Sequence, residues 1–455
     1  MKVLLFNIKG SSARKCINKD LCGGMGSGTW IGDSWRARIF EYVKRKNVVL
    51  PEITIAYIAA IFGKANWEVE LVEVGQGLDF DAAKADLALV PSSIVDCRHE
   101  LEIIKILRKR GFYVGVYGTF VSALPEFFLS DAEFIIRGEA EAGVLKIISD
   151  GRLPRGILEV RPVENIDSLP YPDWSLFPIK KYSYSPALNK KPITVMLASR
   201  GCPYGCCFYC PYPINSGKKV RFRSVENVVE EMECLKNKYG IQAVDFRDPI
   251  FTLNKERILK FAGELIKRKL DIIWSCETRI DCLDEDLLKI MYQAGLRHIN
   301  VGVESASQEV LKKSSRLPIE INHQNKIISF CHKNGISIAA FYIIGMEGDT
   351  EKSVLSTIDY AKKLNTLVAQ FTISTPYPGT DFFDRFKKEG KINTFDWEQY
   401  DAYTPVLEHE FLSAKKLLSL KEKAFVSYYF RLAYLLRHMP KYFFEKLLCQ
   451  VVKIQ

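Results

Sequence analysis

The sequence predicts an α/β protein with a doubly wound N-terminal domain, a partial (β/α)₆ barrel and a helical C-terminal tail. Strand and helix patterns alternate through residues 1–150 and resume after residue 192, with short loops between them. A proline-rich stretch separates the two alternating regions. Alternation of this kind is typical of parallel sheets that are covered by helices.

Length and composition set limits on this prediction. The chain has 455 residues, of which 47% are hydrophobic and 26% are charged, as in a folded globular protein. Its length suggests two or three domains. The apolar run at residues 3–6 is too short for a signal peptide, and no apolar run is long enough to span a membrane, so we expect a cytoplasmic protein.

Residues 1–150 form the first expected domain. A glycine-rich loop follows the first strand, and Pro51 opens the next helix, as proline often does in a first helical turn. Ligands of doubly wound sheets bind at the carboxyl ends of the strands. The expected strands are 2–7, 68–74, 86–90, 113–117 and 133–136, and the other expected helices are 99–110, 124–129 and one that ends at residue 149.

The second half of the chain repeats the alternation. Residues 151–191 contain six prolines and are expected to be a linker. Residues 192–385 then offer six strand–helix units, enough for a partial barrel but too few for a closed eightfold one. Residues 386–455 are expected to be helical, with one helix over 413–436. The expected barrel strands are 194–198, 243–246, 272–276, 298–303, 337–344 and 369–374, with helices at 225–238, 255–267 and 285–294.

Four of the twelve cysteines crowd into nine residues directly after the first barrel strand: Cys202, Cys206, Cys207 and Cys210. A disulfide-rich secreted protein would be shorter and would spread its cysteines, so the cluster indicates a metal site. Three thiolates on one loop can hold three irons of a four-iron cluster and leave the fourth iron open. Zinc is the alternative, but it usually takes four ligands from two separated pairs.

This segment resembles the CxxxCxxC motif of radical S-adenosylmethionine enzymes, which follows the first barrel strand. Tyr209 holds the place of the aromatic residue before the last cysteine. The spacing contains one extra residue, so Cys202 and Cys210 are the fixed ends, and either Cys206 or Cys207 is the middle ligand. The resemblance implies a [4Fe–4S] cluster whose open iron binds S-adenosylmethionine, which one electron cleaves to a 5′-deoxyadenosyl radical.

Segments at the later strand ends extend the resemblance over about residues 190–385. They are 245–248 (DFRD), 278–281 (TRID), 302–307 (GVESAS), 344–350 (IGMEGDT) and 376–380 (PYPGT). Each is a weak signal alone, but their order and spacing after the cysteine loop match the family. The resemblance implies that Tyr209, Asp245, Arg279, Glu304 and Gly345 contact S-adenosylmethionine, and no residue is singled out as catalytic.

The N-terminal region resembles the cobalamin-binding domains that precede some radical barrels, and the linker sequence LPYPDW at 169–174 is typical of that group. The DxHxxG motif that supplies an axial histidine is absent, and His99 is the only histidine of this region. Bound cobalamin would therefore be base-off, with no histidine ligand. The alternative is a related domain without a cofactor. The residues implied in cobalamin binding are Thr54, Ser92, Ser93, Gly118, Thr119, Gly138 and Glu139.

Together these features predict a cobalamin-dependent (class B) radical enzyme that methylates an unactivated carbon. The resemblance implies that the deoxyadenosyl radical removes a hydrogen and that methylcobalamin donates the methyl group. The alternatives are a radical cyclisation, rearrangement or oxidation on the same architecture, and a non-catalytic iron–sulfur or metal-binding protein.

The expected partners are less specific. They are a small-molecule, lipid or peptide substrate and an electron donor, which is a reductase or a protein of the flavodoxin or ferredoxin type. The net charge of +10 selects no partner, and we do not expect nucleic acid. Residues 428–444 mix aromatic and basic side chains, which would suit a membrane surface or a lipid-like substrate, or simply a helix packed on the barrel.

Overall fold

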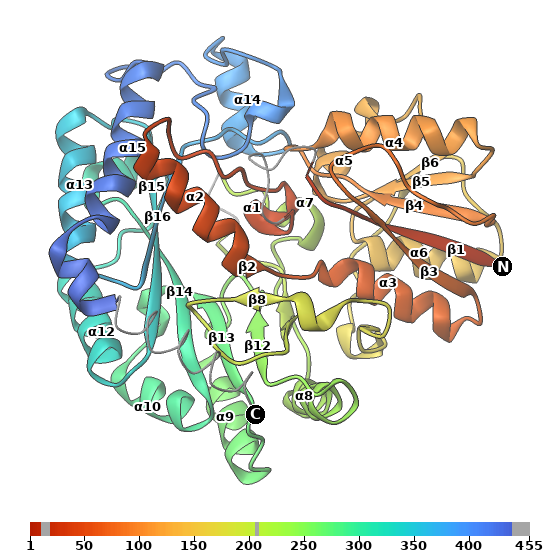
Figure 1. Cartoon of the computed structure of the whole chain (residues 1–455), viewed down its shortest axis with the longest axis horizontal. Coiled ribbons are helices and arrows are strands. Elements are labelled where there is room, and N and C mark those ends of the chain that lie inside the picture. Colours follow the sequence, from red (N-terminus) through yellow and green to blue (C-terminus); the bar gives the residue numbers. More distant parts are fainter. Residues whose placement is uncertain (11–18, 205–208, 439–455) are drawn as a thin grey trace.

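Two parallel sheets, each flanked by helices, form the body of the protein in a computed structural model (Figure 1). The structure describes residues 1–10, 19–204 and 209–438. The α/β class, the doubly wound first sheet, the partial barrel and the helical C-terminal region are confirmed. Among the described residues, no helix is long and apolar enough to cross a membrane.

The first sheet is parallel throughout, and its inner strands are buried on both faces, as the run of apolar residues 3–6 shows. The five strands predicted for this domain are confirmed to within one residue at each end. In pairing order the strands are β3 (Glu68–Val74), β1 (Lys2–Ile8), β4 (Leu87–Pro91), β5 (Val114–Tyr117), β6 (Phe134–Arg137) and β7 (Gly156–Glu159).

Helices α3 (Ile53–Lys64) and α6 (Ala140–Asp150) pack on one face of this sheet, and α4 (Cys97–Lys109) packs on the other. The helix expected at 124–129 is wrong. Helix α5 (Thr119–Ala123) starts earlier, and Pro125 ends it because proline disfavours a helical residue before it. A short 3₁₀ turn, η1 (Pro125–Phe127), follows.

The stretch expected to be a linker contributes the edge strand β7. Its residues alternate between half-buried and exposed, so no apolar run marks it in the sequence. The edge of β6 offers free backbone groups, and β7 pairs with them in parallel. Two 3₁₀ turns, η2 (Ile166–Ser168) and η3 (Ile179–Lys181), and the two-residue strand β8 (Ser183–Tyr184) follow before the barrel.

The second sheet holds six parallel strands, and the six predicted strands are confirmed. In pairing order they are β16 (Val368–Ile373), β15 (Ser337–Ile344), β14 (Leu296–Glu304), β13 (Ile273–Thr278), β12 (Ala243–Phe246) and β9 (Ile193–Met196). Helices cover the convex side: α8 (Val225–Tyr239), α9 (Lys255–Lys267), α10 (Glu285–Gln293), α11 (Gln308–Lys313), α12 (Ile321–Lys333) and α13 (Glu351–Leu364).

A part of the first domain covers the concave side of this open barrel (Figure 1). The loop expected after β1 contains α1 (Leu21–Gly24) and the long helix α2 (Trp35–Asn47). Lys44 of α2 donates to the Gln370 side chain on β16 at 3.4 Å. The strand β2 (Val48–Val49) pairs with β8, from which the Tyr184 hydroxyl reaches Asn300 on β14 at 3.1 Å. The lumen is therefore lined by both halves of the chain.

The C-terminal region packs against the last barrel strand. Helix α14 (Asp381–Lys388) and the turn η5 (Trp397–Gln399) precede α15 (Ala414–Tyr429), and residues 432–438 are again helical. The Tyr429 hydroxyl lies 2.9 Å from both the N–H and the carbonyl of Ala369, donating to the carbonyl and accepting from the N–H. These contacts cover the backbone near the start of β16.

Buried ion pairs join the two halves beside the cysteine loop. The short strands β10 (Ser199–Arg200) and β11 (Arg221–Phe222) form a hairpin around that loop. Arg200 donates to Glu141 at 2.6 Å, and Arg221 donates to Glu139, at the N-terminus of α6. All four side chains are almost fully buried.

Glu139→Ala is expected to lower the free energy of unfolding by ~3–5 kcal/mol, because Arg221 would stay buried without its counter-charge. Denaturant titration followed by circular dichroism measures the change. Glu159 provides a matched control: it forms an exposed pair with Arg137 at 3.0 Å, and Glu159→Ala should cost less than about 1 kcal/mol. Equal losses in the two variants would contradict the prediction.

Candidate functional site

The cysteine loop lies at the carboxyl end of the barrel sheet, directly after β9 and β10. Cys202 and Cys210 are half-buried there, while Cys206 and Cys207 lie outside the described residues. Gly201 has φ of +92°, and a Cβ on it would come 2.1 Å from the Lys219 carbonyl, so glycine is required. The loop is thus held tightly against the β11 side of the hairpin.

The structure places Asp245 in the barrel lumen, at the end of β12. It is fully buried, and the Ser275 hydroxyl donates to its Oδ1 at 2.6 Å. Its Oδ2 has no hydrogen-bond partner among the described residues, although Arg247 lies 3.5 Å away. Burial raises the pKa of the Asp245 carboxyl, and Arg247 opposes that rise.

Arg279 follows β13 and forms a two-point contact with Asp281, at 2.9 and 2.7 Å. Its guanidinium lies 4.4 Å from the ring centre of Tyr204, a residue of the cysteine loop. Its Nη1 is buried and unpartnered within the described part of the chain. This guanidinium therefore connects the carboxyl end of β13 with the cysteine loop.

Glu304 ends β14 with φ of +64°, an uncommon backbone conformation for a residue with a side chain. Its carboxylate pairs with Arg316 at 3.3 Å, and burial raises its pKa. Gly345 directly follows β15, and its N–H donates to Asp349 at 3.0 Å. Burial raises the pKa of Asp349 to about 6.

Tyr209 packs between two groups of apolar side chains, one containing Met346 of the loop after β15 and one containing Phe382 of α14. The residues assigned from the sequence to S-adenosylmethionine therefore meet at one end of the barrel. Their individual roles remain predictions.

The residues assigned to cobalamin also gather at one edge, the carboxyl end of the first sheet. The chain itself already engages most of their polar groups. Ser92 accepts from the Val121 N–H at 3.0 Å, Ser93 donates to Glu100 at 2.8 Å, and Thr119 donates to the Gly23 carbonyl at 2.7 Å. Their contribution to a ligand site is therefore mainly one of shape.

The remaining members of this set differ in position. Gly118 and Gly138 both have φ above +100°, and a Cβ on Gly118 would come 2.6 Å from the Ser92 carbonyl. Thr54 is half-buried in the first turn of α3. Glu139 is occupied by Arg221 and by the Val163 N–H at 2.8 Å, so its carboxylate holds the two domains together.

Two residues at this edge were not predicted from the sequence. The hydroxyl of Tyr117, at the end of β5, is buried and has no partner among the described residues. Glu52 precedes α3, and burial together with the nearby Asp20 raises its pKa to about 8. A tyrosine in an apolar strand and a carboxyl before a helix carry no sequence signal of this kind.

Glu277 on β13 was also missed. Its carboxyl lies within electrostatic reach of Arg247, Asp245 and Glu304, and burial raises its pKa to about 7. Alternation along β13 places it on the same face as Ser275, toward the lumen. The pKa of Glu277 therefore lies close to neutral pH.

Residues 19–26 lie between the carboxyl end of the first sheet and the cysteine loop of the barrel. A Cβ on Gly23 would come 2.6 Å from the backbone N of Tyr212, just beyond Cys210. Thr119 of the first domain also accepts from the Asn215 amide at 3.1 Å. The carboxyl end of the first sheet and the exit of the cysteine loop are therefore neighbours.

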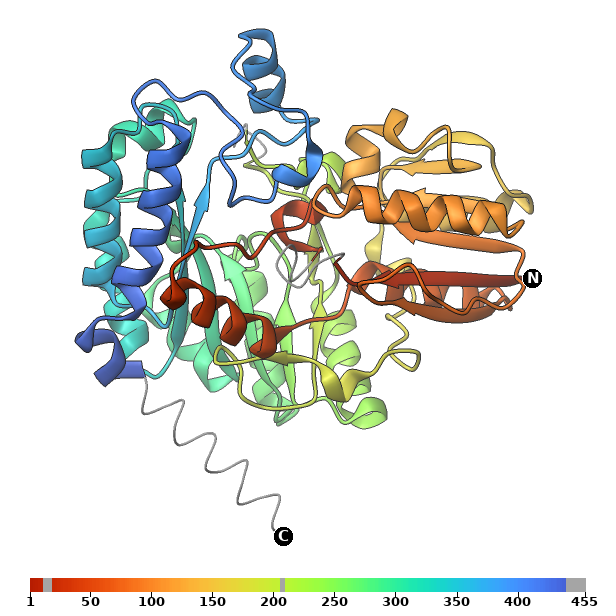
Figure 2. The ribbon, with the colours of Figure 1, turned by 45° about the horizontal axis from the view of Figure 1, so that its top comes forward.

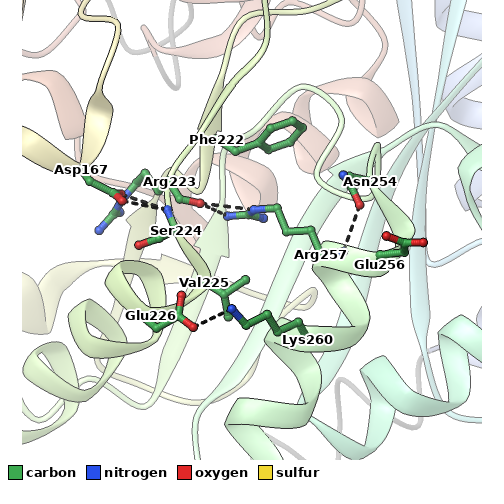
Figure 3. Close-up of a pocket in the computed structure, with 10 residues that line it drawn as sticks. All are labelled: Asp167, Phe222, Arg223, Ser224, Val225, Glu226, Asn254, Glu256, Arg257 and Lys260. Atoms are coloured by element: carbon green, nitrogen blue, oxygen red, sulfur yellow. Dashed lines mark hydrogen bonds and ion pairs between the residues drawn. The ribbon is translucent and has the colours of Figure 1, made fainter.

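A separate open pocket of about 560 Å³ lies on the outer rim of the barrel, between the starts of α8 and α9 (Figure 3). Its basic groups are used within the chain: Arg257 donates to the Arg223 carbonyl at 2.9 Å, and Lys260 pairs with Glu226 at 2.6 Å. Arg257 thereby fixes the start of α9 to the strand that leaves the cysteine loop.

The residues present fit the expected cofactors. Unpartnered buried donor and acceptor atoms on Asp245 and Arg279 suit a zwitterionic ligand beside the cysteine loop. The Tyr117 hydroxyl and the Glu52 carboxyl, which its raised pKa keeps neutral at pH 7, suit the amide groups of a corrin. Among the described residues no group of three metal-ligating side chains is complete, and half of the cysteine cluster lies outside them.

Comparison with known proteins agrees with this arrangement. Residues 196–361 match the model of the radical SAM superfamily. An uncharacterized methyltransferase, PH0819, of Pyrococcus horikoshii is 30% identical over 417 residues, covering 84% of this chain and 88% of the relative. The anaerobic magnesium-protoporphyrin IX monomethyl ester cyclase of Rubrivivax gelatinosus is 29% identical over 350 residues, covering 70% of this chain and 61% of the relative.

A solved structure shares the fold. The radical S-adenosylmethionine methyltransferase TsrM from Kitasatospora setae, with cobalamin and a [4Fe–4S] cluster bound, superposes with a TM-score of 0.63 at 17% identity. The match covers 93% of this chain and 82% of TsrM. The chain belongs to the radical S-adenosylmethionine superfamily, as an enzyme of its methyltransferase-like group. Membership implies a [4Fe–4S] cluster and S-adenosylmethionine as cofactors.

Glu277→Gln should make the protein relatively more stable as pH rises. In the unfolded chain this carboxyl ionises near pH 4.5, but in the folded protein it ionises near 7. Between these values the folded state holds the extra proton, so wild-type stability falls with rising pH, and the glutamine variant avoids this loss.

Thermal unfolding midpoints of both proteins between pH 5 and 8.5 measure the effect. Glu309→Gln, an exposed carboxyl on α11, is the control and should show a pH-independent difference from wild type. A constant difference for Glu277→Gln as well would show that Glu277 is ionised throughout this range.

Proposed function

We propose that this enzyme methylates an unactivated carbon of its substrate by cobalamin-dependent radical chemistry. One observation carries the proposal: residues 19–26 bring the carboxyl end of the first sheet next to the exit of the cysteine loop. A radical formed at the barrel and a methyl donor held by the first domain would then face one shared space. A relative that is 30% identical to this chain is named a methyltransferase, which supports the same function.

In this proposal Cys202, Cys210 and either Cys206 or Cys207 hold the [4Fe–4S] cluster. Gly201 lets the backbone follow the cluster closely, because its positive φ leaves no room for a side chain. The ion pairs of Arg200 and Arg221 fix both ends of the loop. The loop can then hold its thiolates in place without further ligands from another segment of the chain.

The proposed S-adenosylmethionine site lies beside this loop. Asp245 and Arg279 offer the amino and carboxylate groups a buried acceptor and a buried donor. Glu304 and Gly345 lie at the next two strand ends, toward the nucleoside, and Tyr209 packs over the loop after β15. Burial of these groups strengthens each contact, since the local dielectric is low.

The proposed cobalamin site is the carboxyl edge of the first sheet. No large side chain projects from the strand ends at Ser92, Ser93 and Gly118, so a flat ring can approach the backbone there. The Tyr117 hydroxyl, which has no partner among the described residues, is available to its amide groups. The Glu52 carboxyl, whose pKa burial raises to about 8, lies at the same edge. The domain offers no histidine from a DxHxxG motif, which supports base-off binding.

When bound, the cluster supplies the electron that cleaves S-adenosylmethionine, and cobalamin supplies the methyl group. The chain's own part is to exclude water and to fix the substrate between them. Helix α2 and the ribbon β2–β8 cover the lumen, where Arg247 offers a cation and Glu277 a carboxyl group with a pKa of about 7 to a polar group of the substrate. The substrate, a small molecule, lipid or peptide, would enter this space, and a reductase or a flavodoxin- or ferredoxin-type protein would deliver the electron.

A second candidate is a radical cyclisation without methyl transfer on the same architecture. The relative from Rubrivivax gelatinosus named as a cyclase favours it. Both functions need the same cluster and the same cleavage of S-adenosylmethionine. They differ in whether the product gains a carbon.

Cys202→Ala and Cys210→Ala should abolish the iron–sulfur absorbance and the formation of 5′-deoxyadenosine, because three thiolates are needed to hold the cluster. Anaerobically reconstituted protein, reduced with dithionite, is assayed by iron and sulfide content and by chromatography of deoxyadenosine. Of Cys206→Ala and Cys207→Ala, one should match these variants and the other should match wild type. Cys282→Ala, at the same end of the barrel but outside the loop, is the control.

Full cluster content in both the Cys206 and the Cys207 variant would refute the ligand set. A stable cluster with no deoxyadenosine from wild type would refute radical chemistry on S-adenosylmethionine.

Methyl transfer predicts that a product gains the methyl group of S-adenosylmethionine. The reduced enzyme, loaded with cobalamin, is incubated with cell extract and with S-adenosylmethionine that carries an isotopically labelled methyl group. Mass spectrometry should find a labelled product that is absent with Cys210→Ala. Deoxyadenosine formation that consumes a compound of the extract without labelling its product would favour cyclisation instead.

A further inference from the structure

Helix α2 buries charged side chains and exposes apolar ones, the reverse of an ordinary surface helix. Its charged residues Glu41 and Lys44 face the barrel: Glu41 is 1% exposed and accepts from the Ile31 N–H at 2.7 Å, and Lys44 reaches Gln370. Surface helices normally bury their apolar side instead. The outward side of α2 carries Trp35, Ile39, Tyr42 and Val43, which are 64%, 49%, 53% and 44% exposed.

These four residues share one face, because they are spaced by four, three and one positions along the helix. The face continues onto the end of α15 and the helical residues 432–438. The Trp35 ring lies 6.3 Å from the Phe430 ring, and the Phe40 ring lies 4.2 Å from that of Tyr429, so the two segments are packed together (Figure 2).

Leu432 and Leu436 extend the apolar area, with 70% and 68% of their surfaces exposed. We call the combined area the α2 surface. It consists of Trp35, Ile39, Tyr42, Val43, Phe430, Leu432, Leu435 and Leu436. Exposed apolar side chains gathered in this number on adjoining segments mark an interaction site.

The α2 surface is bordered by positive charge. Arg36, Arg38 and Lys46 are exposed on α2, and Arg437 is exposed beside Leu436. Glu41 is the sole acidic residue in the segments 35–47 and 430–438, and it is buried. The partner should therefore offer apolar area together with negative charge.

We propose that the α2 surface binds the surface of a membrane that contains anionic lipids. Trp35 and Tyr42 are side chains that favour the membrane–water interface, and arginine and lysine at the border can reach the lipid phosphates. Each basic residue near an anionic membrane adds to the attraction. The helix would lie in the plane of the interface, with its charged side still holding the barrel.

A second copy of the chain fits this surface less well. A symmetric dimer would place the same surface on both partners, so the basic border would face itself with no exposed carboxylate on these segments to meet it. A bilayer supplies both the apolar and the anionic component. The inference is independent of the proposed methylation.

Vesicle flotation with the full-length protein tests the proposal. The protein should float with vesicles of phosphatidylcholine mixed with phosphatidylglycerol, and binding should weaken in high salt and on vesicles of phosphatidylcholine alone. The double variant Leu432→Ser/Leu436→Ser should need about tenfold more lipid, or beyond, for half-binding, because each leucine buries apolar area in the bilayer. Both leucines are largely exposed, so the fold should survive.

Leu317→Ser is the matched control, since Leu317 is 60% exposed in a loop far along the chain, after α11. Arg36→Glu/Arg38→Glu tests the charged border, with Lys267→Glu on α9 as its control. Both controls should bind like wild type, and circular dichroism should show that all variants are folded.

The proposal is overturned if wild type does not float with anionic vesicles, or if the leucine double variant floats as well as wild type. Loss of binding in Leu317→Ser to the same extent would also overturn it. A dimer in light scattering that the double variant dissociates, without flotation of wild type, would assign the surface to a second copy instead.

Discussion

The buried ion pairs at the base of the cysteine loop are the constraint on which the rest of the structure depends. Arg200 lies just before the cysteine loop and Arg221 lies after it. Their partners, Glu141 and Glu139, belong to the first domain. The two carboxylates also lie at the N-terminus of α6, where the helix dipole favours negative charge. Charges that are buried together are costly to separate, so the loop and the edge of the first sheet keep a fixed relation.

Much of the fold could be predicted from the sequence because its inner strands are buried on both faces. The strands at 243–246 and 337–344 and the helix at 255–267 agree with prediction residue for residue, and Asn254 caps that helix as its position suggests. The elements that were missed are not buried in this way. β7 is a half-exposed edge strand, and α2 leaves Trp35, Ile39 and Tyr42 exposed, so neither follows the usual periodicity.

The sequence located the site better than it explained it. The carboxyl ends of parallel strands meet at one edge, so motifs at Asp245, Arg279 and Glu304 had to lie near each other once the strand order was known. Pairings between distant residues have no such rule. Glu139 was assigned to cobalamin, but its carboxylate binds Arg221, 82 positions away, and the unpartnered hydroxyl of Tyr117 becomes visible through burial alone.

The long insertion after β1 has a physical explanation in the open barrel. The six-stranded barrel sheet stays open, because β9 and β16 lie at its two edges and do not pair with each other. A lumen left open on one side would admit water to any reactive intermediate formed there. In this chain α2 and the ribbon β2–β8 cover the concave side. Lys44 of α2 contacts Gln370 on β16, and Tyr184 of β8 contacts Asn300 on β14. Because α2 must present polar groups to that polar lumen, its apolar side is left facing outward. The closure of the barrel and the exposed α2 surface are therefore two consequences of the same helix orientation.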